Sequence, residues 1–166
     1  MNALKPSEVV KELDKYIIGQ DQAKRSVGIA LRNRWRRQNA PDDIRDEIIP
    51  NNIIMIGPTG VGKTDTAVRV AEALGTEIIS ADSRQVYKNM NIGTGKDLED
   101  FIRRNIIYHL IDICVLKDEY NLFRFKKDFA SAFEMILNKN KMPILVGGTG
   151  LYISAVVQDY DLPTIK

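Results

Sequence analysis

The hydrophobic positions of this chain follow two spacings, and each spacing predicts one kind of element. Four short apolar runs rich in β-branched residues are typical of buried strands in a parallel sheet. They cover residues 53–56, 78–81, 106–113 and 143–146. Apolar residues at helical spacing predict helices over 2–15, from Asp21 onward, from Thr64 to Leu74 and over 121–139. Because strands alternate with helices, we expect an α/β fold with a parallel sheet of about four or five strands flanked by helices, and an N-terminal helical appendage.

The loop between the first strand and the helix that follows it carries the clearest chemical signal. Its sequence fits G-x-x-x-x-G-K-[ST] at every fixed position: Gly57, Pro58, Thr59, Gly60, Val61, Gly62, Lys63, Thr64. Glycines let backbone N–H groups surround a phosphate, and the helix points its positive end at the same place. We expect Lys63 to reach the outer phosphates and the Thr64 hydroxyl to help hold Mg²⁺. The alternative is a chance glycine turn, but the flanking strand and helix favour a P-loop NTPase-like core.

Composition narrows the class of protein without identifying its ligand. The 166 residues suggest one domain, with room for an appendage, and 44% hydrophobic with 28% charged residues is ordinary for a globular protein. A net charge of +2 is too small to indicate nucleic acid binding by itself. The single cysteine, Cys114, excludes an internal disulfide and fits a reducing compartment. No run approaches the roughly 18 apolar residues of a membrane span, so we expect a cytoplasmic protein with no membrane partner.

The N-terminal third carries a first resemblance. Residues 16–20, 23–27 and 30–37 resemble the N-terminus of the HslU-type AAA+ ATPase, the unfoldase of a bacterial two-component protease, and the resemblance covers residues 3–64. It implies that Ile18 packs on an adenine and that the phosphate loop holds ATP. From the residues alone, 16–18 is more simply a packing corner between two helices. Four arginines around Trp35 fit either an RNA phosphate contact or, as we favour, a solvated helix end.

The rest of the chain carries a second resemblance. Residues 77–87, 90–96, 108–113 and 143–152 resemble tRNA dimethylallyltransferases in the order of that family, over about residues 57–162. The resemblance implies that Asp82 is the general base for an attack by the exocyclic amine of a tRNA adenosine, beside the anticodon, on dimethylallyl diphosphate. The phosphate loop, with Lys63 and Mg²⁺, would then hold the departing diphosphate rather than ATP. It also implies that Ser83, Arg84 and Gln85 line the route of the substrate base, and that Thr149 lies near the tRNA.

Other residues compete for these roles, and several alternatives stay open. An aspartate facing a bound diphosphate suits a general base, but Asp82 could instead cap a helix or support a Mg²⁺ ligand. Asp112 loosely resembles the strand-borne Mg²⁺ aspartate of P-loop NTPases, although we interpret it as structural. His109 has no clustered metal-ligating residues, so packing or surface exposure is the simpler interpretation. Residues 147–150, Gly-Gly-Thr-Gly, fit a substrate contact and a strand-to-helix turn equally well.

Neither resemblance includes all the regions that are typical of its family. The HslU-like part stops at the phosphate loop, and the transferase-like part lacks the later helical region that clasps the anticodon arm in that family. We therefore expect a chimera-like chain that joins a helical segment, residues 1–50, to a truncated α/β core, residues 51–166. Three hypotheses follow: a transferase core with Asp82 as base, an ATP-binding module of the HslU type, and a catalytically inactive chimera, natural or engineered. The candidate ligands are Mg²⁺ with ATP or dimethylallyl diphosphate, and the candidate macromolecular partner is tRNA.

Overall fold

The computed structural model describes residues 5–15, 19–45, 47–48, 53–56, 63–96 and 98–162. The chain divides into two compact units, Met1–Ile53 and Ile54–Lys166. Residues 16–18, which include the predicted adenine contact Ile18, lie outside the described residues, and so do residues 57–62 of the phosphate loop.

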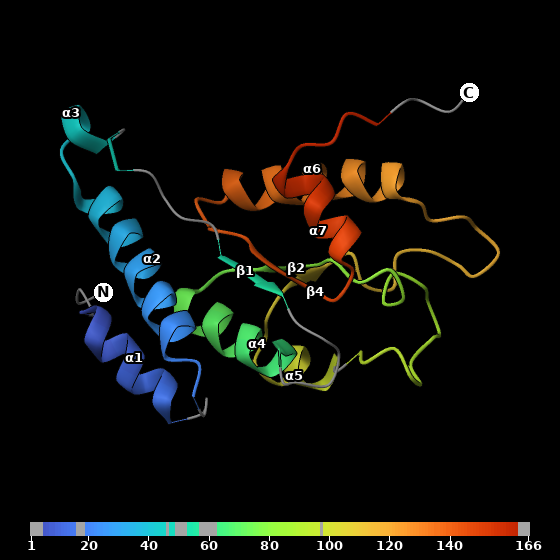
Figure 1. Cartoon of the computed structure of the whole chain (residues 1–166), viewed down its shortest axis with the longest axis horizontal. Coiled ribbons are helices and arrows are strands. Elements are labelled where there is room, and N and C mark those ends of the chain that lie inside the picture. The colour runs from blue at the N-terminus through green and yellow to red at the C-terminus, as the bar shows by residue number, and fades with distance from the viewer. Residues whose placement is uncertain are drawn as a thin grey trace. The chain divides into compact units, whose positions relative to one another are not determined.

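The first unit is helical. It contains α1 (Pro6–Asp14), α2 (Asp21–Asn39) and the short α3 (Asp42–Arg45). The helices α1 and α2 pack against each other (Figure 1), and they bury Val9 and Leu13 of α1 and Val27 and Ala30 of α2. A Cβ on Gly28 would lie only 2.9 Å from the backbone oxygen of Pro6, so this glycine permits the close approach of the two helices. The predicted N-terminal helical appendage is confirmed.

The second unit is built on a four-stranded sheet. Its strands are β1 (Ile53–Ile56), β2 (Ile78–Ser80), β3 (Tyr108–His109) and β4 (Ile144–Gly147), in the order β1-β4-β2-β3. The central strand β2 runs parallel to both neighbours: Ile78 lies opposite Ile144 on β4 and Tyr108 on β3. A buried β2 and β4, rich in isoleucine and valine, is what a parallel sheet covered on both faces requires.

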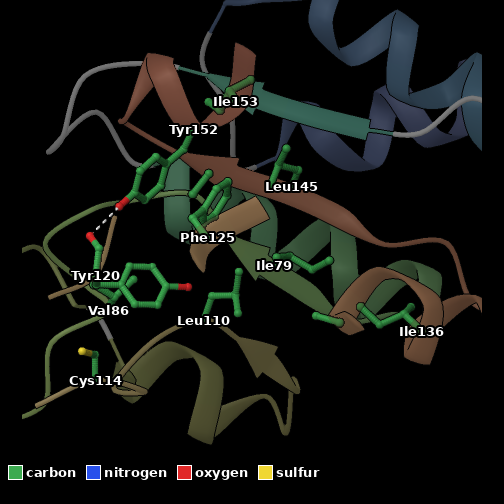
Figure 2. Packing of buried hydrophobic residues seen from close by; sticks show 12 residues of the cluster. Ile79, Val86, Leu110, Cys114, Tyr120, Phe125, Ile136, Leu145, Tyr152 and Ile153 are labelled. Atoms are coloured by element: carbon green, nitrogen blue, oxygen red, sulfur yellow. Dashed lines mark hydrogen bonds between the residues drawn. The ribbon is translucent and has the colours of Figure 1, made fainter. Parts of the chain in front are cut away.

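Four helices flank this sheet: α4 (Lys63–Leu74), α5 (Leu98–Arg103), α6 (Leu122–Asn138) and α7 (Gly150–Val157). In Figure 1, α6 and α7 lie on one side of the sheet, and α4 and α5 lie on the other. Figure 2 shows the core of this unit, where the ring centroids of Phe125 and Tyr152 stack 4.0 Å apart in one cluster with Ile79 and Leu145. The predicted α/β fold, a parallel sheet flanked by helices, is therefore confirmed.

The strand predicted over residues 106–113 is largely wrong. Only Tyr108–His109 forms a strand, because the backbone turns sharply after it: Leu110 has φ 63° and Asp112 has φ 55°. The amide of Asp112 donates to the Gln85 carbonyl at 3.0 Å, and the amide of Ile113 donates to the Val86 carbonyl at 2.9 Å. This apolar run therefore leaves the sheet and packs along the turn that follows β2.

Candidate active site at the ends of strands β2 and β4

Two loops converge where the adjacent strands β2 and β4 end. Asp82 follows β2 by two residues, and Thr149 follows β4 by two residues. Because the strands are parallel neighbours, their carboxyl ends lie together, which is where open α/β sheets bind ligands. The amide of Thr149 donates to the Ala81 carbonyl at 3.1 Å. A Cβ on Gly147 would lie 2.2 Å from that same oxygen, so only glycine lets the two loops approach this closely.

Asp82 is buried and organises the turn after it. The residue is 5% exposed, and its Oδ1 accepts a hydrogen bond of 3.0 Å from the Arg84 amide. The Arg84 guanidinium lies 3.4 Å from the same carboxylate, and the Arg84 side chain is half exposed. The residues after Asp82 form a turn and not a helix, so Asp82 is not a helix cap. Its carboxylate instead accepts a backbone amide within that turn.

A pair of hydroxyl groups ties the two loops together. The Ser83 amide donates to Thr149 Oγ1 at 2.9 Å, and Thr149 Oγ1 donates in turn to Ser83 Oγ at 3.2 Å. Thr149 sits at the N-cap position of α7 without capping it through its side chain. Residues 147–150 thus form a strand-to-helix turn, and Thr149 also braces the Asp82 turn; a role for Thr149 toward a substrate stays a prediction.

Gln85 is held by hydrogen bonds within the protein. Its Oε1 accepts from Ser80 Oγ at 2.9 Å, and its Nε2 donates to the Gly95 carbonyl at 2.9 Å. Its side chain therefore links the end of β2 to the loop before α5. The prediction that Ser83, Arg84 and Gln85 line the route of a substrate base stays a prediction, and Gln85 also has this clear internal role.

The described end of the phosphate loop is the start of α4. Lys63 is the first residue of that helix, and Thr64 is half-buried in its first turn. The helix itself is well anchored, because Ala67, Val68 and Ala71 are fully buried. The phosphate-contact predictions for the loop lie outside the described residues: Gly57, Pro58, Thr59, Gly60, Val61 and Gly62.

Asp112 and His109 are each paired with a residue that the sequence did not single out. Lys96 Nζ lies 2.6 Å from Asp112 Oδ1, which agrees with a structural role for Asp112. His109 Nε2 lies 2.9 Å from Glu77 Oε2, on a glutamate that is fully buried at the start of β2. Within the described ranges, no three His, Cys, Asp or Glu residues gather in a way that could hold a metal ion.

Glu77 is a buried charge surrounded by cations. Lys139 and Lys141, which follow α6, lie 2.9 and 3.2 Å from its carboxylate, in addition to His109. Burial by itself would raise the pKa of Glu77, but the hydrogen bonds from His109, Lys139 and Lys141 outweigh it and lower the pKa to about 2. This cluster lies at the opposite end of β2 from Asp82, so it supports the sheet rather than the candidate site.

Comparisons with known proteins identify relatives of the second unit. The protein-family model for IPP transferase matches residues 85–166. The C-terminal part of the chain matches the IPP transferase family. The tRNA dimethylallyltransferase 1 of Azobacteroides pseudotrichonymphae is 57% identical over 112 residues, which are 66% of this chain and 37% of that protein. The tRNA dimethylallyltransferase 2 of Treponema denticola is 51% identical over 112 residues, 68% of this chain and 37% of that protein.

Solved structures of IPP transferases share this fold. The full-length tRNA isopentenylpyrophosphate transferase of Bacillus halodurans superposes with a TM-score of 0.65 and 38% identity, over 70% of this chain and 38% of that one. A eukaryotic dimethylallyltransferase acting on tRNA gives a TM-score of 0.59 and 36% identity, over 62% of this chain and 25% of that one. The chain thus spans 37% of the length of the first curated relatives. The HslU-like origin of the N-terminal segment stays a prediction.

No helix among the described residues is long and apolar enough to cross a membrane.

Proposed function

We propose that the chain carries the catalytic core of a tRNA dimethylallyltransferase, which moves a dimethylallyl group from its diphosphate to the exocyclic amine of a tRNA adenosine. One observation carries this proposal: a buried aspartate, Asp82, at the carboxyl end of the parallel sheet, held by Arg84 and followed by Ser83, which is hydrogen-bonded to Thr149. The names of the relatives support the same reaction. We further propose tRNA and a prenyl diphosphate as partners, and the cytoplasm, where tRNA and reduced thiols occur, as the location.

In this proposal Asp82 acts as the general base. The adenosine nitrogen forms a bond to the first carbon of the dimethylallyl group while the bond from that carbon to the diphosphate oxygen breaks. The diphosphate leaves with the electron pair, and the amine proton passes to the Asp82 carboxylate. The buried position of Asp82 limits competition from water, and the Arg84 amide fixes the orientation of its carboxylate. The half-exposed guanidinium of Arg84 at the same turn supports a proposed role for Arg84 toward the anionic substrates.

The diphosphate is assigned to the loop of residues 57–64 and to Lys63, at the positive end of α4. The hydroxyl of Thr64, in the first turn of α4, is an oxygen donor of the kind that Mg²⁺ binds, so this residue fits a Mg²⁺ carried with the diphosphate. When bound, Mg²⁺ would neutralise charge on the departing diphosphate.

We propose that residues 1–50 form a helical segment of the HslU type, joined to the transferase core at residues 51–166. The packing of α1 on α2, with Lys24 Nζ 2.5 Å from Asp14 Oδ1, supports a compact helical segment. Its HslU type rests on the resemblance of residues 16–20, 23–27 and 30–37 alone.

Replacement of Asp82 by Asn tests the proposed function. The amide keeps the shape of the side chain but cannot take the proton, so we expect transfer of labelled dimethylallyl groups to tRNA to fall by about 10²–10⁴-fold. Binding of dimethylallyl diphosphate, measured by calorimetry, should persist. Asp118→Asn, at an exposed aspartate outside the site, is the matched control and should transfer like the wild type. Unchanged transfer in Asp82→Asn would show that the base is another group.

A further inference from the structure

A buried lysine lies behind the Asp82 turn. The side chain of Lys96 is fully buried, and its Nζ lies 2.6 Å from Asp112 Oδ1 and also donates to the backbone oxygen of Tyr87. Lysine is rarely buried to this degree unless it is paired, since removing an ammonium group from water is costly. The charge of Lys96 is therefore tolerated in this buried position because the Asp112 carboxylate and the Tyr87 backbone oxygen both accept hydrogen bonds from it.

The two acceptors belong to the segments that border the candidate site. Tyr87 is in the turn that starts at Asp82, and Asp112 is in the segment that leaves β3. These segments also pair through the backbone, because the Asp112 amide donates to the Gln85 carbonyl and Tyr87 bridges Cys114 in parallel. Lys96 thus connects three stretches of chain, its own loop included, through one ammonium group.

Gln85 completes a closed circuit of hydrogen bonds. Its side chain donates to the carbonyl of Gly95, the residue next to Lys96, while its own carbonyl accepts from Asp112. Asp112 holds φ at 55°, a left-handed conformation that a non-glycine residue keeps only where its surroundings favour it. The ion pair to Lys96 supplies that support, so loss of Lys96 should release the Asp112 backbone from the turn.

From this circuit we propose that Lys96 and Asp112 are positioning residues that hold the Asp82–Gln85 turn in the conformation needed for transfer. This inference rests on the proposed function. Lys96 is 14 positions from Asp82 in the sequence, and its ammonium group reaches the turn through Tyr87 and Asp112, so we infer that it acts through other residues and not on a substrate.

The test compares Lys96→Met and Asp112→Asn with the wild-type chain. Methionine fills a similar volume without the ammonium group, and asparagine keeps the shape of aspartate without its charge. The first readout is amide hydrogen exchange at Arg84, Asp112 and Ile113, whose amides report the turn and the segment beside it. The second readout compares the change in kcat for transfer with the change in Kd for dimethylallyl diphosphate, both measured well below the unfolding temperature.

Two matched controls separate positioning from general destabilisation. Lys117→Met removes an exposed lysine and should change nothing. Glu77→Gln weakens the same unit at the far end of β2 without touching the turn. In both variants of the pair we expect exchange at the three amides to rise by about 10-fold or more and kcat to fall by about 10–100-fold, with the diphosphate Kd unchanged.

The outcomes are distinct. Unchanged exchange at the turn, or an equal loss of kcat in Glu77→Gln, overturns the proposal, since either result would make the pair an ordinary stabilising contact. A wild-type chain that transfers nothing overturns the proposed function instead. In that case the exchange rates, which need no substrate, still decide whether the pair holds the turn.

Discussion

The hydroxyl of Thr149 is the side-chain group that links the loops after β2 and β4. It accepts from the Ser83 amide and donates to the Ser83 hydroxyl, at 2.9 and 3.2 Å. A half-buried amide that loses its acceptor keeps the cost of its desolvation, which exceeds the net gain of an ordinary hydrogen bond. The orientation of the Asp82 turn therefore depends on an oxygen atom at position 149.

Removal of that oxygen should destabilise the folded chain. Thr149→Val keeps the volume but loses the acceptor, so we expect the free energy of unfolding to fall by about 1–2 kcal/mol. Urea denaturation measures it. Thr149→Ser retains the hydroxyl and should lose less than half as much. A Thr149→Val variant as stable as the wild type would contradict the importance of this contact.

Single residues differ in how far the sequence reveals their roles. Asp82 and Thr149 could be predicted as neighbours because each follows an apolar strand, and parallel strands end at one edge of the sheet. Lys96 and Glu77 could not, because lysine and glutamate are usually solvated and their partners are distant in sequence. The Lys96–Asp112 pair spans 16 positions, and the Lys139–Glu77 pair spans 62. No local spacing marks such pairs.

Among the elements, strand β2 depends on the charge cluster at its start. Glu77 is fully buried there, and its carboxylate receives hydrogen bonds from His109 on β3 and from Lys139 and Lys141 after α6. These bonds lower the pKa of Glu77 from its ordinary value of 4.5 to about 2 despite its burial. The cluster joins two strands and the end of a helix through a single side chain.

The stability of the sheet should therefore depend on pH in a defined range. Because the pKa of Glu77 is lower in the folded than in the unfolded chain, its contribution is fully present above about pH 4.5 and is lost as the pH falls towards 2. We expect Glu77→Gln to lose on the order of 3 kcal/mol of unfolding free energy at pH 7. In urea titrations this loss should shrink below pH 4.5.

Glu134→Gln, at an exposed glutamate of α6, is the control and should follow the wild type at every pH. A loss in Glu77→Gln that is the same at pH 3 as at pH 7 would mean that the charge of Glu77 does not carry the effect.

The predicted helices and strands were confirmed where the spacing of apolar residues alone determines the element. The helix predicted over 121–139 is α6, Leu122–Asn138, because its apolar positions keep helical spacing and Asn121 caps it by accepting from the Arg124 amide at 3.0 Å. The strand predicted over 106–113 was largely wrong because its apolar residues are buried by tertiary contacts and not by pairing in the sheet. Leu110 joins the core and Asp112 is held by tertiary contacts with Gln85 and Lys96, which the pattern of one segment does not contain.

The whole chain combines two compact units of different character. The second unit has relatives that are named tRNA dimethylallyltransferases, and this chain spans 37% of their length. Sequence alone predicted its fold class and most of its sheet, because strand–loop–helix order and the glycine-rich loop are local signals. The sequence did not distinguish between ATP and a prenyl diphosphate as the ligand, because a phosphate loop binds the phosphates of either one with the same backbone groups.

The identity of that ligand is therefore the central claim to test, and calorimetric titration with dimethylallyl diphosphate and with ATP, each with Mg²⁺, tests it most directly. If the second unit is a transferase core, dimethylallyl diphosphate binds more tightly than ATP, and Lys63→Ala weakens its binding. Tighter binding of ATP would contradict this and favour an ATP-binding module. Binding of neither ligand would contradict both and leave a P-loop fold without this function.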